Sequence, residues 1–213
     1  MSGYAGPMVT RRAPDARRRR ADAERSIAAI VQAAATAFSE RPDVSLTDVA
    51  RAAGVGRVTL YAHFPTREAL LEAAVEHAVA DAVTALDAAR IDDGPADEAV
   101  GRLVRLAWPT LDRHRGLHTA ASVLHPSVLR DRHSAVLERI RRLIERGQAE
   151  GSIRADLSAD WLVTVCYSLM HGAAEAVNDR RLDRVDAADA LEKAVGGALA
   201  TPHHPSNAGA EDR

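Results

Sequence analysis

Basic, hydroxyl and aromatic side chains gather between residues 45 and 67, and their types suit contacts to DNA. An arginine donates hydrogen bonds from a planar fork that matches the O6 and N7 acceptors of guanine, and Arg57 is the candidate for that contact. Val58 and Thr59 carry methyl groups that could meet the methyl groups of thymine. This chemistry requires that the three residues lie on one helix that fits a groove of DNA.

The residues around them predict two short helices joined by a tight turn. Ser45 can cap the first helix, and Gly54 stands where that helix should end in a positive-φ residue. A second short helix is expected over about 56–64, with Leu60 and Phe64 on its inner face. Two such helices describe a helix-turn-helix, in which the second helix enters the major groove.

The same stretch resembles the TetR-type (TetR/AcrR) bacterial transcriptional regulators. The resemblance is carried by TDVARAAGV at 47–55, TLYAHF at 59–64 and PTREALL at 65–71. It implies an all-α fold of about nine helices, with an amino-terminal three-helix helix-turn-helix domain followed by a larger helical effector-binding and dimerisation domain. We therefore expect a DNA-binding domain over 23–66 and the larger domain over 67–200.

The resemblance also implies phosphate contacts on either side of the recognition helix. The matching positions are Ser45, Thr47, Tyr61, His63 and Arg67. For Tyr61, packing between helices is the structural alternative. Gly56 stands where the family often has a capping Ser or Thr, and Val58 where it often has a small residue. These departures predict one missing phosphate contact and an unusual sequence preference.

A basic segment precedes these helices. Residues 1–25 hold seven arginines against three acidic residues, on a chain whose formal net charge is only −2. We expect residues 1–22 to form a disordered arm that follows phosphates or enters the minor groove; a solvated tail without function is the alternative. The candidate contacts are Arg17, Arg18, Arg19 and Arg20.

Composition and periodicity predict helices over the whole remaining chain. Aromatic residues make up 3% of the 213 residues, whereas alanine, leucine and arginine, which favour helices, are abundant. The first helix should begin at Ala23 and bury an apolar stripe that starts with Ile27, and Pro109 should kink or end another helix. The further helices are expected at about 67–90, 97–113, 117–124, 127–150, 158–179 and 186–200, followed by a disordered tail at 201–213.

The cysteine content and the hydrophobic runs of the sequence bear on the cellular compartment of the protein. The only cysteine, Cys166, excludes an internal disulfide and is expected to be an inert buried thiol. No apolar run approaches the length of a membrane span, and no signal peptide opens the sequence. We expect a cytoplasmic, nucleoid-associated protein without a membrane partner.

Histidines and large side chains mark a possible ligand pocket. They lie where the effector pocket of the resembled family usually forms, and the candidates are Trp108, His114, His118, Tyr167, Met170 and His171. Plain core packing is the alternative for Tyr167 and Met170. The chain lacks the H-E-x-x-H and paired-cysteine patterns of zinc sites, so we expect neither a metal nor a cofactor.

Small and apolar residues mark the last two helices as a dimer interface in the resembled family. The candidates here are Trp161, Val165, Leu169, Gly172, Leu191, Val195 and Leu199, with packing inside one chain as the alternative. The sequence thus predicts a ligand-responsive repressor, not an enzyme, that binds a palindromic operator as a homodimer and responds to an unknown small molecule. A ligand-independent regulator or activator is the main alternative, and a helical enzyme or metal-binding protein a distant one.

Overall fold

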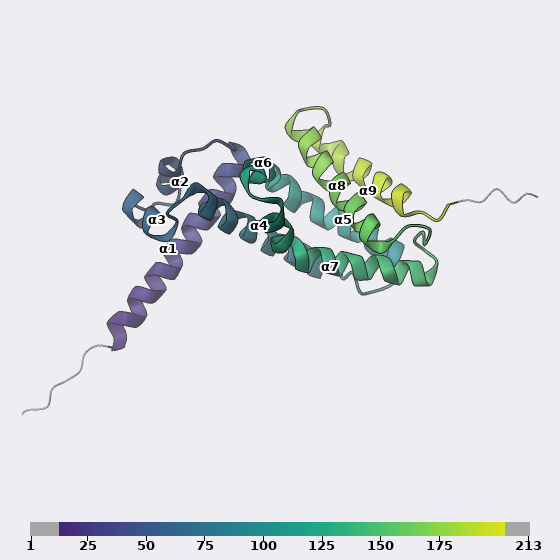
Figure 1. Cartoon of the computed structure of the whole chain (residues 1–213), viewed down its shortest axis with the longest axis horizontal. Coiled ribbons are helices and arrows are strands. Elements are labelled where there is room, and N and C mark those ends of the chain that lie inside the picture. Colours follow the sequence, from purple (N-terminus) through teal and green to yellow (C-terminus); the bar gives the residue numbers. More distant parts are fainter. Residues whose placement is uncertain (1–12, 203–213) are drawn as a thin grey trace, which may run out of the picture.

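The computed structural model describes residues 13–202, and within that range the chain is all-helical. The elements are α1 (Ala13–Glu40), α2 (Leu46–Ala52), α3 (Arg57–His63), α4 (Arg67–Ala89), α5 (Ala96–Arg113), α6 (Arg115–Ala120), a 3-10 turn η1 (Ala121–Val123), α7 (Pro126–Glu150), α8 (Ala159–Asn178) and α9 (Arg184–Leu199). This architecture confirms the predicted fold class. The first three helices form the helix-turn-helix domain, and the larger helical domain follows (Figure 1).

Two apolar cores hold these helices together. The amino-terminal core centres on Ile30, Phe38 and Leu60, and the other core fills the space between α4, α5, α7, α8 and α9. Helix α4 contributes to both, because Leu70 lies in the first core and Leu86 in the second. A single rigid helix therefore connects the two parts of the molecule, and the predicted domain boundary at residue 66 stays a prediction.

Helix α1 is longer than the sequence analysis predicted. It begins at Ala13 instead of Ala23, so residues 13–22 are helical and the prediction of a disordered arm is wrong for them. The physical reason is local: residues 15–40 contain no glycine or proline and are rich in alanine and arginine, which are among the best helix formers. The arm predicted for residues 1–12 and the tail predicted for residues 203–213 lie outside the described residues.

One further expectation, the burial of Ile27, needs correction. Ile27 is 37% exposed because the first half of α1 extends beyond the body of the molecule, as Figure 1 shows, and the core begins only at Ile30. Helix α5 continues through Pro109 and ends at Arg113, as the predicted range 97–113 has it. Among the described residues, no helix combines the length and hydrophobicity needed to cross a membrane.

Candidate nucleic-acid interface and ligand cavity

The turn between α2 and α3 has the geometry that its sequence predicts. The Asp48 amide donates to Ser45 Oγ at 3.1 Å, and the Ser45 hydroxyl donates to Asp48 Oδ2 at 2.7 Å. That second bond lowers the pKa of Asp48, with a further contribution from Arg51. Gly54 adopts φ 68°, a conformation that glycine reaches without strain. The first two contacts cap the start of α2, and Gly54 makes the turn into α3.

Helix α3 presents a distinct outer face. Arg57 is exposed, and Val58 and Tyr61 are 85% and 42% exposed, whereas Leu60 is completely buried beneath them. An exposed valine on a short helix is unusual, because burial of its side chain would be favourable by roughly 1.5–3 kcal/mol. The face of α3 is therefore available to a partner surface, and Thr59 and His63 lie half-buried at its margins.

Arg67 has structural contacts in addition to its predicted contact with phosphate. Its guanidinium donates to the backbone carbonyls of Val44 and Pro42 and lies 4.8 Å from the centre of the Phe38 ring. These contacts join the start of α4 to the loop that precedes α2. Ser45 is exposed and Thr47 half-buried at the start of α2, and their phosphate contacts stay predictions.

The four arginines predicted to contact DNA lie on the projecting half of α1. Residues 17–20 are all exposed, and since successive helical residues are about 100° apart, their side chains point around the helix instead of to one side. Figure 1 shows this half of α1 at the same end of the molecule as α2 and α3. Within the described residues, a basic helical segment thus accompanies the helix-turn-helix.

A cavity of about 180 Å³ lies in the larger domain, between α4, α5, α6, α7, α8 and α9. Most of its wall is aliphatic: α4 contributes residues from Val75 to Leu86, α5 residues from Val100 to Leu111, and α9 contributes Val195 and Leu199. An apolar cavity of roughly 150 Å³ is known to hold benzene, so this volume suits a small organic molecule.

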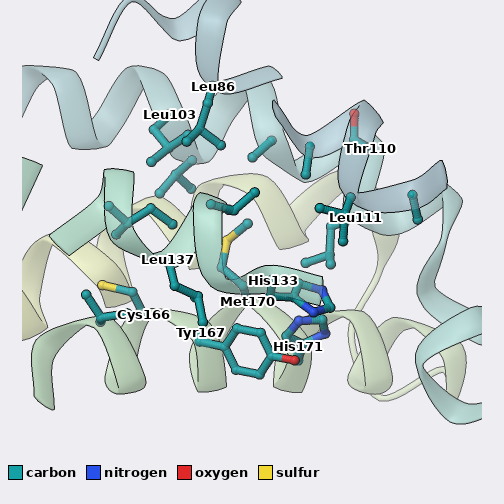
Figure 2. Close-up of a pocket in the computed structure, with 18 of the residues that line it drawn as sticks. Leu86, Leu103, Thr110, Leu111, His133, Leu137, Cys166, Tyr167, Met170 and His171 are labelled. Carbon is teal, nitrogen blue, oxygen red and sulfur yellow. The ribbon is translucent and has the colours of Figure 1, made fainter. Parts of the chain in front are cut away.

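Three histidines and a tyrosine form a polar group on one side of this cavity (Figure 2). The rings of His118 and His171 stack at 4.3 Å between centres, and Tyr167 lies 4.2 Å from His171. His133 approaches Tyr167 at 5.9 Å and His171 at 6.4 Å, both edge-on. We call His118, His133 and His171 the histidine cluster.

Burial governs the protonation of these groups. It lowers the pKa of His171 to about 3, with smaller effects from the neighbouring His118 and His133. Burial also lowers the pKa of His118 and raises the pKa of Tyr167. At neutral pH, His118 and His171 therefore carry no charge. Burial raises the pKa of the nearby Cys166 thiol to about 11, which agrees with the expected inert thiol.

His114 is a further polar residue in the wall of the cavity. Its Nε2 lies 3.0 Å from Asp81 Oδ2, so Nε2 carries the proton and donates to that carboxylate. Its buried Nδ1 has no hydrogen-bond partner among the described residues. A buried polar atom of this kind is costly unless a ligand or a water satisfies it.

Five of the six residues predicted for a pocket line this cavity, and Trp108 does not. Trp108 is buried in the larger core instead, so its prediction is wrong: the apolar stripe of α5 continues through it, and the neighbouring helices cover it. His133 also lines the cavity and was not among the predicted residues. Its spacing was informative, since it follows Leu129 by four residues and precedes Val136 by three on the inner face of α7.

The predicted dimer interface divides into two groups. Leu191, Val195 and Leu199 are buried inside the chain, so their prediction is wrong: the inner face of α9 packs on α5 and α8 and leaves nothing for a partner. Trp161 is 55% exposed, and a Cβ added at Gly172 would meet no atom within 4 Å. Val165 and Leu169 are half-buried.

One close contact joins the cavity wall to the DNA-binding end. A Cβ added at Gly116 on α6 would lie 2.8 Å from the carbonyl carbon of Ser39 and closer still to its oxygen. Only glycine allows α6 to approach the end of α1 this closely. The next residues of α6, Leu117 and His118, line the cavity, so the wall of the cavity rests directly on α1.

Among the described residues, no three histidine, cysteine, aspartate or glutamate side chains lie where they could hold a metal ion.

Comparison with known proteins points to one family. Residues 30–74 match the family model "Bacterial regulatory proteins, tetR family", and residues 97–175 match "Tetracyclin repressor-like, C-terminal domain". The HTH-type transcriptional repressor LfrR of Mycolicibacterium smegmatis is 32% identical over 161 residues, which cover 73% of this chain and 81% of LfrR. The HTH-type transcriptional regulator NfxB of Pseudomonas aeruginosa is 26% identical, over 77% of this chain and 89% of NfxB.

A solved structure extends the similarity to three dimensions. The crystal structure of LfrR from Mycobacterium smegmatis in complex with proflavine superposes with a TM-score of 0.68 at 27% identity, covering 84% of this chain and 98% of that one. The similarity therefore includes both the helix-turn-helix and the larger helical domain.

Proposed function

The chain belongs to the TetR family of bacterial DNA-binding transcriptional regulators, and from this premise we propose that it is a ligand-responsive repressor that binds a palindromic operator as a homodimer. The observation that carries the proposal is the contact between α6 and α1, because it joins a ligand-sized cavity to the DNA-binding end. LfrR, a relative, is a repressor whose structure was solved with proflavine, which supports a small-molecule effector for this chain.

In the proposed complex with DNA, α3 lies in the major groove. Arg57 donates to O6 and N7 of a guanine, and the exposed methyl groups of Val58 meet thymine methyls. Tyr61 and the start of α2 contact phosphates on either side. The basic half of α1 lies along the sugar-phosphate backbone of the DNA, and its contribution to the affinity for DNA falls as salt rises.

In the proposed homodimer, the outer faces of α8 and α9 from two subunits pack together. Trp161 supplies an exposed aromatic anchor, and Gly172, Gly196 and Gly197 leave open space that a partner helix can approach closely. A two-fold dimer presents its two α3 helices to half-sites one or more helical turns apart, so the operator should be a palindrome.

In the proposed switch, a ligand in the cavity acts through α6. Residues on this short helix line the cavity, and Gly116 touches Ser39 at the end of α1. A ligand that fits better when α6 has moved favours an arrangement in which the two α3 helices no longer match the operator. The ligand shifts this equilibrium only by its difference in affinity for the two states.

Selection of genomic fragments by the purified full-length protein tests this function. We expect enrichment of short palindromic sequences, protection of two half-sites in footprinting, and a protein-to-duplex ratio of at least two chains per site. Binding should weaken steeply as salt rises from 50 to 200 mM, since phosphate contacts release counterions. Enrichment of no common sequence would contradict the repressor proposal, and protection of a single half-site by one chain would contradict the dimer.

A further inference from the structure

The cavity has two chemically different parts, and together they specify a class of ligand. The walls from α4, α5 and α9 are aliphatic, whereas the histidine cluster and Tyr167 occupy one side (Figure 2). A bound molecule should therefore carry an apolar body and one polar head that meets imidazole groups.

The cluster accepts protons and hydrogen bonds in its neutral form. His133 Nδ1 lies 2.7 Å from the Leu129 carbonyl oxygen, which only accepts, so Nδ1 bears a proton and donates to that oxygen. Burial disfavours the charged forms of His118 and His171, because it lowers the pKa of each, that of His171 to about 3. Each neutral imidazole offers one acceptor nitrogen and one N–H donor to the head group of a ligand.

The surroundings of the cluster hold little charge. Among the carboxylates, Glu175 on α8 is exposed and acts weakly on His118, and Asp81 on α4 is bound to His114. Tyr167 on α8 and Thr110 on α5 are the uncharged polar neighbours, and α9 contributes only aliphatic side chains. Among the described residues, the cavity wall contains no carboxylate, so a cationic head would meet bases without a counter-charge.

We infer that the cavity binds a lipophilic weak acid, with its carboxyl group against His118, His133 and His171 and its hydrocarbon body along the aliphatic walls. This inference rests on the proposed role of the cavity as the effector site and names the class of effector. On binding, the carboxylate brings one proton from solvent into the cluster. The proton lies between a carboxylate oxygen and an imidazole nitrogen, where the charge-assisted hydrogen bond replaces the lost hydration of both groups.

Three eight-carbon probes separate this class from its competitors. Octanoate, octanol and octylamine share the same chain and differ only in the head: acid, neutral and cationic. Direct binding to the full-length protein is measured by isothermal titration calorimetry at pH 6 and pH 8. We expect octanoate to bind at least about tenfold more tightly than octanol or octylamine at pH 6, because hydrogen bonds to charged groups are the strong ones.

The pH dependence gives an independent readout. Since octanoate is ionised in this range and His171, whose pKa burial lowers to about 3, is unprotonated, a proton shared between the carboxylate and His171 is taken up on binding, and octanoate affinity should fall by up to about tenfold per pH unit from pH 6 to pH 8. Titration in two buffers of different ionisation enthalpy measures that proton directly. Equal affinity for octanoate and octanol, tighter binding of octylamine, or no proton uptake would each overturn the inference.

Variants locate the head group. His171→Phe keeps an aromatic ring beside His118 and Tyr167 but removes both nitrogens, and we expect the octanoate-to-octanol affinity ratio to fall at least about tenfold. His118→Phe serves the same purpose if the first variant does not fold. Met170→Leu, which alters the wall without removing a titratable group, is the matched control: both affinities shift together and their ratio stays. An unchanged ratio in both histidine variants would contradict the placement of the head.

The two proposals fail in different experiments. The ligand class is decided by calorimetry without DNA, whereas the repressor function is decided by selection of an operator and by its release. Preferential binding of octylamine would overturn the inference that the ligand is an acid, and the proposed repressor function would be unaffected. Octanoate that binds as described but does not release a selected operator would keep the ligand class and refute its role as effector.

Discussion

Replacement of Gly116 by alanine tests the contact that joins the cavity to the DNA-binding end. The added Cβ would lie 2.8 Å from the Ser39 carbonyl carbon and 3.1 Å from its Cα, with the oxygen closer still. All three are backbone atoms in the last turn of α1, so no side chain can rotate away to make room. Carbon atoms pack at about 3.5–4.0 Å, and α6 must therefore retreat from α1 by roughly 1 Å.

The magnitude follows from two opposing effects. Overpacking of a close contact costs about 1–3 kcal/mol, whereas replacement of a helical glycine by alanine returns about 0.5–1 kcal/mol through backbone entropy. We expect a net loss of roughly 0.5–2 kcal/mol in the free energy of unfolding. In a chain of this size each kcal/mol lowers Tm by about 2–4 °C.

Gly101→Ala provides a matched control within helix α5. A Cβ there would meet only the ends of flexible side chains, Glu192 at 3.4 Å and Arg105 at 3.5 Å, so the entropic gain should dominate. Both variants are compared with the parent by thermal and urea unfolding, followed by circular dichroism at 222 nm. Gly116→Ala should be less stable than the parent and Gly101→Ala equal or more stable. If Gly116→Ala were as stable as Gly101→Ala, the close contact between α6 and α1 would not exist in solution.

Further predictions concern the dimer, the cluster and the thiol. Gly172→Arg should convert the dimer to a folded monomer in sedimentation velocity, because a Cβ at this position meets no atom of the same chain within 4 Å. The control Gln32→Arg, at an exposed site on α1, should leave the dimer intact. A Gly172→Arg variant that stays dimeric would refute the proposed interface. Because the pKa of His171 falls to about 3 on folding from about 6.5 in the unfolded chain, the unfolded chain binds the extra proton, and this residue should lower stability by about 1.4 kcal/mol per pH unit as pH falls from 6 to 5. That loss should be absent in His171→Phe when urea unfolding is compared at the two pH values, and a parallel loss in both proteins would contradict it. Because burial raises the pKa of Cys166 to about 11, a thiol reagent at pH 8 should react slowly with the folded protein and at least about tenfold faster in urea, and equal rates would refute the burial.

Local sequence chemistry was sufficient for the helix-turn-helix. The cap at Ser45, the positive φ at Gly54 and the buried Leu60 each depend on neighbours within a few residues, so pattern and propensity determine them. The composition of residues 15–40 also favours helix, but the emphasis on charge led to the prediction of a disordered arm. Helix propensity prevailed over the repulsion between adjacent arginines.

The cavity and the dimer surface depended on packing that sequence patterns do not contain. An apolar stripe such as Leu191, Val195 and Leu199 indicates burial, but it cannot say whether the covering surface belongs to the same chain or to a partner. Likewise, His133 and Trp108 both lie on inward helical faces, and only the arrangement of neighbouring helices decides which of them reaches a cavity. The Gly116 contact joins residues far apart in the chain and has no local signature.

The affinity of the Arg57→Ala variant for a selected operator tests the central claim most directly. Fluorescence anisotropy at fixed salt compares the parent, Arg57→Ala, and Arg142→Ala, which removes the same charge from an exposed site on α7. We predict that Arg57→Ala loses about 5- to 150-fold in affinity for the operator but little for a random duplex, whereas Arg142→Ala loses neither. An equal loss for operator and random duplex, or no loss for either, would contradict the assignment of α3 as the helix that reads DNA.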